Sequence, residues 1–340
     1  MSEKFKAMTN KFLEEFDLSW NKMMEIIEYN QIQLSNGNRL RPQICLWGFL
    51  AAKTDFDNVI PELPHIASVS VSLEMIHKAS ILIDDWLDED EVRHGVSAFH
   101  TEFPLQDTIL VALNMIALST VRLKKEFAET SVKLPHHYFT CLDTVLKTIY
   151  AMAKGALKEL RLNEFDFYNS ATIKEIIQLE TAEIIGSCLL VGYYTGIKEN
   201  ERNIYIENTL KRIGDQCGYL FQAMNDLEAF SNPQKLFSYK GNLNSDIMKQ
   251  RKNIGVAMLY ELANKHDKKL LVDSLEANLF PLMQKYDIVS ILKRQLNALY
   301  ENVLHEIGGI QEFGIPFEWC IGFKEFWAYV KKYAESRLEA

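Results

Sequence analysis

The sequence predicts an all-α protein built as a single large helical bundle. Only 8 prolines and 15 glycines occur among 340 residues, so long stretches pass without a helix breaker. Leu, Ile, Met, Glu, Lys and Ala dominate, and the alternating Val-rich segments typical of strands are few. Long segments also place apolar residues at intervals of three and four, which is the periodicity of a buried helix face.

Seven segments show this periodicity and are predicted as helices: residues 66–87, 108–127, 139–162, 173–194, 205–230, 246–265 and 287–306. Several are apolar around most of their circumference, as the central helices of a large bundle are. The breaks between them contain proline and glycine, but none is a Ser/Gly-rich linker and no internal repeat is present. We therefore expect one domain over residues 1–340, with residues 280–340 forming a C-terminal helical section packed on the rest.

The charge of the chain excludes nucleic acid as a partner. Its 46 acidic and 37 basic residues give a net charge of −9, and no basic stripe offsets the repulsion of phosphates. An acidic protein whose substrate is an anion needs a cation between the two. The composition therefore favours a metal ion over a simple basic pocket.

The cysteines and the N-terminal segment predict a cytoplasmic protein. Five cysteines are scattered without a CxxC pair, which indicates buried free thiols in a reducing compartment. The first 16 residues carry several charges and lack the apolar core of a signal peptide. We find no run of 18 apolar residues, so no membrane span is expected.

A cluster of aspartates closes the predicted helix over residues 66–87. Asp84 and Asp88 are four residues apart, so their carboxylates share one helix face, with Asp85 beside them. Like charges at this spacing destabilise a helix, and acids at its C-terminal end oppose the macrodipole. Mg²⁺ binds carboxylates and bridges them to substrate phosphates. We therefore predict that Asp84 and Asp88 bind Mg²⁺.

A second apolar helix also ends in polar residues. Asn225 and Asp226 carry oxygens that suit a hard cation, and Gln222 lies one turn earlier on the same face. Alone, such a pair is common near helix ends. Together with the first cluster, it predicts the opposite wall of one metal site.

Basic residues lie at intervals around these two clusters. His77 lies two helical turns before Asp84 on the same face. Arginine forks suit phosphate oxygens, whereas lysine acts as a point charge. A single basic residue is more often a surface charge than a ligand. The spacing from the acidic clusters nevertheless makes these basic residues candidates for binding phosphate: Arg39, Arg41, His77, Lys240, Arg251 and Lys252.

Over residues 37–260 these motifs resemble the trans-isoprenyl diphosphate synthase (polyprenyl synthetase) family. The resemblance is carried by Asp84-Asp85-x-x-Asp88 followed by Arg93 and Gly95. It implies an all-α fold around a central cavity, a homodimer, and three Mg²⁺ ions that hold an allylic prenyl diphosphate between the two motifs. Departure of the diphosphate then leaves an allylic carbocation, which the alkene of isopentenyl diphosphate attacks. The metal neutralises and positions the leaving group.

The resemblance also assigns residues to roles. Arg93 matches the arginine that contacts the allylic diphosphate, and Arg41 and His77 match binders of isopentenyl diphosphate. Arg251, or Lys252, matches the lysine that follows the second motif. Ala79 lies where short-chain synthases carry a bulky aromatic, so it implies an open channel and a product of C20 or longer, unless it is simply a packing alanine. The implied catalytic residues are Asp84, Asp85, Arg93, Arg251 and Lys252; the substrate-binding ones are Arg39, Arg41, His77, His94, Thr181, Gln222, Lys240 and Ala79; the metal ligands are Asp84, Asp85, Asp88, Asn225 and Asp226.

Five positions depart from the family pattern. Asn38 replaces a lysine of the first basic loop, which spans residues 36–42, His94 replaces an arginine, and Glu180 replaces the lysine before Thr181. The second motif carries Asn225 and Ala229 where the family has aspartates. These departures leave the acceptor open, although isopentenyl diphosphate is the default.

Three alternatives remain beside the leading hypothesis. The run from Asn225 to Ala229 resembles the second motif of ComQ-type enzymes, which prenylate a tryptophan of a bacterial signalling peptide, so a peptide or other non-isoprenoid acceptor is the first alternative. A class I terpene cyclase is weakened because Ala229 and Pro233 replace its motif residues. A non-catalytic partner subunit of a synthase is the last, and the intact first motif argues against it.

Overall fold

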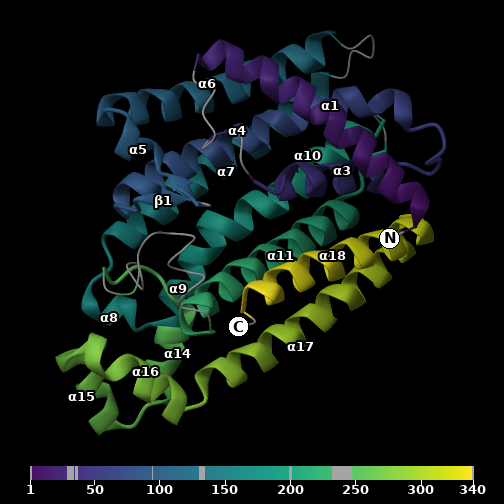
Figure 1. Cartoon of the computed structure of the whole chain (residues 1–340). Helices are drawn as coiled ribbons and strands as arrows, with labels where there is room; N and C mark the ends of the chain where they lie inside the picture. Colours follow the sequence, from purple (N-terminus) through teal and green to yellow (C-terminus); the bar gives the residue numbers. More distant parts are fainter. Residues whose placement is uncertain are drawn as a thin grey trace.

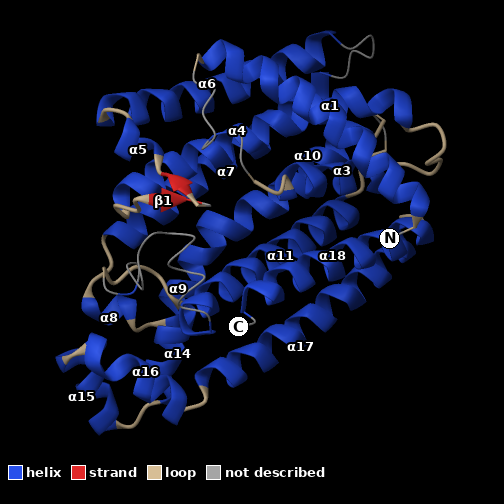
Figure 2. Ribbon diagram, viewed as in Figure 1, coloured by secondary structure: helices blue, strands red, loops and turns tan. Residues whose placement is uncertain are grey.

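The computed structural model describes residues 2–28, 34, 37–93, 95–129, 135–198, 201–231, 247 and 249–338. The all-α prediction is confirmed, since the regular secondary structure of the described residues is helical apart from one two-stranded hairpin (Figures 1 and 2). In chain order the helices are α1 (Glu3–Ile27), α3 (Leu40–Ala51), η1 (Ile60–Glu62), α4 (Leu63–Leu87), α5 (Phe99–Glu102), α6 (Leu105–Glu129), α7 (Pro135–Leu160), α8 (Glu164–Phe167), α9 (Ser170–Ile177), η2 (Gln178–Ala182), α10 (Glu183–Gly196), α11 (Ile204–Ser231), α14 (Ile254–Leu262), α15 (Lys265–Asp273), α16 (Leu275–Lys285), α17 (Ile288–Gly309), η3 (Ile310–Phe313) and α18 (Phe317–Leu338). The hairpin strands β1 (Val92–Arg93) and β2 (Val96–Ser97) are antiparallel, with Val92 opposite Ser97.

Helix α10 lies at the centre of the bundle and packs against α3, α7 and α11, while α4 packs against α1, α3 and α6. Nearly every residue of α10 is buried, which explains why it is apolar all round. The α3–α10 contact depends on Gly192, because a Cβ at this position would lie 2.0 Å from the carbonyl oxygen of Cys45. Only glycine permits the two backbones to approach so closely.

Most predicted helices coincide with observed ones, and the difference is greatest after α11. Residues 246–265 were expected to be one helix, whereas α14 begins only at Ile254 and ends at Leu262. Residue 250 has a positive φ of 53°, so the helix does not extend back through it. The side chain of Asn253 accepts hydrogen bonds from the backbone N–H groups of Gly255 and Val256, and this cap fixes the start of α14.

The C-terminal helices α17 and α18 pack against α11, and α18 also reaches α3 (Figure 1). The indole N–H of Trp319 on α18 donates a hydrogen bond of 2.8 Å to the carbonyl of Trp47 on α3. This buried bond ties segments 272 residues apart. The division into one domain with a C-terminal section stays a prediction.

Within the part of the chain that the structure describes, two helical segments are long and apolar enough to cross a membrane when judged by length and composition alone. They span Ile60–Leu87 and Ser170–Gly196, and 78% and 72% of their apolar windows are buried inside the protein. Core helices of a bundle have the same composition, because they are covered by protein on all sides.

Candidate active site

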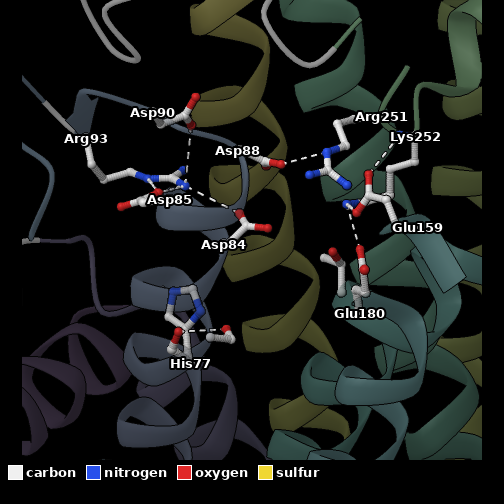
Figure 3. A network of polar contacts seen from close by, with 12 residues as sticks. His77, Asp84, Asp85, Asp88, Asp90, Arg93, Glu159, Glu180, Arg251 and Lys252 are labelled. Carbon is white, nitrogen blue, oxygen red and sulfur yellow. Dashed lines mark hydrogen bonds and ion pairs between the residues drawn. The ribbon is translucent and has the colours of Figure 1, made fainter. Parts of the chain in front are cut away.

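The first acidic motif lies where α4 ends. The backbone N–H of Asp90 bonds to the carbonyl of Asp85 at 2.9 Å, and Glu89 adopts a positive φ of 52°, so the chain leaves the helix axis here. The β1–β2 hairpin then folds back over the helix end. This return brings Arg93, on β1, to the carboxylates of α4 (Figure 3).

Arg93 forms a charge-assisted contact with the motif. Its Nε donates to Asp85 Oδ1 at 2.7 Å, and its terminal nitrogen lies 3.5 Å from Asp84 Oδ2. Asp85 is only 3% exposed, and burial raises the pKa of its carboxyl to about 6, with Arg93 opposing the rise. The side chain of Asp84 is about half exposed, so of these two carboxylates it is the more accessible to an incoming cation.

Asp88, the third residue of the motif, contacts a different cation. Arg251 Nε lies 2.8 Å from Asp88 Oδ1, and the same guanidinium donates to the carbonyl of Leu87 at 3.0 Å. Lys249 Nζ also donates to the carbonyl of Asp88. Cations at a helix C-terminus interact favourably with its dipole, which is the local reason for this arrangement. The structure thus places Arg251 beside the first motif, although 163 residues separate it from Asp88.

Lys252 lies between two carboxylates (Figure 3). Its Nζ is 2.9 Å from Glu159 on α7 and 2.6 Å from Glu180 on η2. A Cβ at Gly155 would lie 2.6 Å from Glu180 Cγ, so this glycine on α7 makes room for the glutamate. Burial lowers the pKa of Lys252, but Glu159 and Glu180 outweigh this effect and raise it well above its usual value. Lys252 therefore stays charged between the two acids.

The second motif is held by protein contacts. The hydroxyl of Thr181 donates to Gln222 at 3.1 Å, and the Gln222 amide donates to Asp226 at 2.8 Å. The other carboxylate oxygen of Asp226 accepts the backbone N–H of Ile254 at 2.9 Å, at the start of α14. Thr181 belongs to η2, a π-helical turn of the kind often found at functional sites.

The donors fit Mg²⁺ chemically, because both motifs offer carboxylate and amide oxygens. Within the described ranges, however, no three His, Cys, Asp or Glu side chains stand close enough to share one ion. Asp85 and Asp88 are paired with arginines, and both oxygens of Asp226 accept protein donors. The two motifs as opposite walls of one metal site, including Asn225, therefore stay a prediction.

The first basic loop divides its side chains between two environments. The Arg41 guanidinium donates to His77 Nε2 at 2.7 Å, so these two predicted substrate binders are together. The Arg39 guanidinium lies 5.2 Å from the ring centres of both Phe16 and Trp20 on α1. Packing on α1 accounts for Arg39 without a substrate.

The remaining predicted residues are a buried alanine and two positions that are not described. Ala79 is completely buried on α4. His94 and Lys240 lie outside the described residues, as does the side chain of Ala229. Sequence reasoning missed Lys249 and Glu159. Glu159 meets Lys252 across 93 residues of chain, and no local pattern marks such a pair.

Comparison with known proteins shows the family. A family model described as Polyprenyl synthetase matches residues 21–289. A geranylgeranyl pyrophosphate synthase of Geoglobus acetivorans is 26% identical over 228 residues, which are 67% of this chain and 65% of that protein, slightly less than two thirds of its length.

Solved structures share the fold. A geranylgeranyl pyrophosphate synthetase of Pyrococcus horikoshii superposes with a TM-score of 0.76 at 20% identity, covering 96% of this chain and 99% of that one. A geranylgeranyl pyrophosphate synthase of Corynebacterium glutamicum, solved with isoprenyl diphosphate and magnesium, gives a TM-score of 0.74 at 15% identity, with 96% and 98% covered. The family match covers most of the chain, including the first motif and its cations: this protein belongs to the polyprenyl synthetase family.

Proposed function

We propose that this chain is a Mg²⁺-dependent prenyltransferase that ionises an allylic prenyl diphosphate and transfers the prenyl group, by default to isopentenyl diphosphate. The observation that carries the proposal is the end of α4, where three aspartates meet Arg93 and Arg251. Alternating carboxylates and guanidinium groups suit a metal-bound diphosphate, which needs both kinds of ligand. The geranylgeranyl synthases among the relatives support this substrate class.

The protein groups would act on the diphosphate in defined ways. Arg93 and Arg251 would each donate to phosphate oxygens, since a guanidinium fork matches them bidentately. Asp84, Asp85 and Asp88, with Asn225 and Asp226, would hold Mg²⁺, and we adopt the family number of three ions. The metal supplies neutralisation of the charge that develops on the leaving diphosphate. Buried Ala79 supports a product of C20 or longer, because its small side chain adds no bulk to that face of α4.

A peptide or other non-isoprenoid acceptor is the second candidate, and one observation favours it. The side chain of Asn38 accepts the backbone N–H of Leu40 at 3.2 Å and brings no positive charge to the first basic loop. A weaker anion site there would suit an acceptor without a diphosphate. This candidate retains the same allylic substrate and the same first step.

We also propose a homodimer formed through α6 and α7. These two helices contact each other and leave large apolar side chains exposed: Ile109, Leu110, Leu113 and Val121 on α6, and Phe139, Leu146, Tyr150 and Leu157 on α7. Large apolar surfaces of this kind mark interaction sites. A second copy of this chain is the expected occupant of this surface.

The cytoplasmic location of the protein stays a prediction.

A product assay tests the proposal. The enzyme is incubated with Mg²⁺ and geranyl, farnesyl or geranylgeranyl diphosphate, each with and without isopentenyl diphosphate, beside a control in EDTA. A longer prenyl diphosphate that requires both Mg²⁺ and isopentenyl diphosphate is the expected result. A hydrocarbon or alcohol from the allylic substrate alone would instead identify a cyclase, and no turnover would overturn chain elongation and direct the search to a peptide acceptor or partner subunit.

A further inference from the structure

Lys78 is a buried lysine on α4 that belongs to none of the sequence motifs described above. It follows His77 directly, and the residue is only 3% exposed. Its Nζ lies 3.5 Å from the point where a Cβ at Gly37 would stand, so the ammonium reaches the loop before α3. A lysine from α4 thus meets the first basic loop beside Asn38.

The charges around Lys78 come from three elements. Glu74 and His77 lie on α4, Arg39 and Arg41 come from the loop and α3, and Arg93 comes from the hairpin. Burial lowers the pKa of Lys78 to about 8; Glu74 opposes this, while the arginines at positions 39, 41 and 93 add to it. Four cationic side chains with Glu74 therefore share a poorly solvated region. Such a region favours a multivalent anion, because Coulomb attraction grows as water is excluded.

The neighbouring groups narrow the location of that anion. Arg41 donates a hydrogen bond to His77, so these two predicted substrate binders lie together. Arg39 lies over the rings of α1 and 3.7 Å from Glu74. The side-chain oxygen of Asn38 accepts a hydrogen bond from the backbone N–H of Leu40. Lys78 can supply a charge that Asn38 cannot.

We propose that Lys78 binds the diphosphate of the acceptor substrate together with Arg41 and His77, and so replaces the cation that Asn38 lacks. The assignment rests on the proposed function, with isopentenyl diphosphate as the acceptor. The assignment favours a diphosphate acceptor over a peptide. A buried lysine near Arg41 attracts an anion, whereas the uncharged side chain of a peptide acceptor would not pair with it. An ammonium is a suitable point charge for phosphate oxygens.

The first test separates the two substrates. Lys78→Met should raise the KM for isopentenyl diphosphate about tenfold or more, and change the KM for the allylic diphosphate less than twofold. Adding Asn38→Lys to the Lys78→Met variant should restore much of the affinity for isopentenyl diphosphate, because the new lysine would supply the missing positive charge from the first basic loop. Lys53→Met is the matched control; Lys53 pairs with Glu62 and lies beyond the far end of α3, about 18 Å along the helix, and should have no effect. An unchanged KM for isopentenyl diphosphate, or equal rises for both substrates, overturns the proposal.

A binding measurement keeps the test independent of turnover. Calorimetry with inorganic pyrophosphate in EDTA should show weaker binding to Lys78→Met than to the wild type, even if no prenyl product forms. Equal binding overturns the Lys78 assignment, whereas absent turnover with retained Lys78-dependent binding would overturn only the proposed reaction.

A third measurement serves if Lys78→Met does not fold. Wild-type affinity for pyrophosphate should fall from about pH 8 upward relative to Lys78→Arg, because the arginine stays charged and the titration of pyrophosphate itself is common to both proteins. Parallel pH profiles would overturn the proposal.

Discussion

Arg93 donates a hydrogen bond of 2.7 Å to Asp85, a carboxylate that is only 3% exposed (Figure 3). The pair joins a hairpin strand to the end of α4, and it stabilises a charge that burial disfavours. Asp85 and Asp84 would hold Mg²⁺ in the proposed reaction. Arg93, which contacts both aspartates, would donate to the oxygens of the bound diphosphate.

Asp84→Ala should abolish Mg²⁺-dependent turnover, with a loss on the order of 100-fold or more in kcat, because an accessible ligand for the cation that stabilises the leaving group is removed. Initial rates over a Mg²⁺ series would measure it. Asp57→Ala is the control, since the side chain of this aspartate is 82% exposed and pairs with Lys4 on α1. Unchanged activity in Asp84→Ala would remove the metal assignment.

Glu180→Gln should lower the KM for the allylic diphosphate about three- to tenfold. The substitution weakens the contact between Glu180 and Lys252, whose Nζ lies at 2.6 Å, so the positive charge of Lys252 acts more strongly on the diphosphate. Steady-state kinetics at saturating acceptor would measure the change. Glu183→Gln, one turn along the chain and paired with Lys211, is the matched control and should leave this KM unaltered. A higher KM in Glu180→Gln would show that the glutamate assists binding.

The fold could be predicted largely because long apolar helices carry their own periodicity, as α4, α10 and α11 do. Helix α1 was missed even though Phe12, Phe16 and Trp20 recur at a helical spacing and are buried. Its charged residues, such as Lys11 and Glu14, were read only as evidence against a signal peptide. The short helices α15 and α16 have fewer turns and thus a weaker pattern.

The site was predictable where its residues are neighbours in sequence. Asp84, Asp85 and Arg93 are joined by one helix end and one hairpin, so their spacing carried the signal. The Lys252–Glu159 pair depends on how α7 meets the segment before α14, and nothing local encodes it. Lys78 was overlooked for a similar reason, because its role depends on the loop at Gly37 rather than on its own helix.

Ala79→Phe should shorten the prenyl product by at least one isoprene unit, because a bulky ring on this face of α4 would block the lengthening chain. Ala79 is completely buried, so overpacking should also cost about 1–3 kcal/mol of stability. Product chromatography and thermal unfolding would measure the two effects. Ala67→Phe, three turns earlier on α4 and equally buried, controls for overpacking alone. An unchanged product length would place the floor of the channel elsewhere.

Asp215→Asn should stabilise the protein at neutral pH. Burial raises the pKa of Asp215 from 3.8 to about 6, with Lys211 opposing, so the native state binds its proton more tightly than the unfolded state. The stability from this group is fully present below pH 3.8 and is lost as pH rises through 6. The free energy of unfolding of the variant should therefore rise relative to that of the wild type between pH 4 and pH 6.5, by at most about 3 kcal/mol. Urea unfolding at several pH values would test this, and a constant difference would contradict it.

Leu113→Glu combined with Tyr150→Glu should convert a dimer into a monomer. Both side chains are more than half exposed in the single chain, on α6 and α7, so the substitutions should change the stability of the isolated chain by only about 0.5 kcal/mol. Two carboxylates buried in an apolar contact would instead be costly, because each would lose its hydration without a partner. Light scattering after size exclusion would give the mass of each protein. Phe165→Glu on α8 is the control, since its side chain is 83% exposed but lies on a different element. If the wild type already has the mass of one chain, the proposed interface is wrong; if the double variant stays dimeric, the two copies meet through another face.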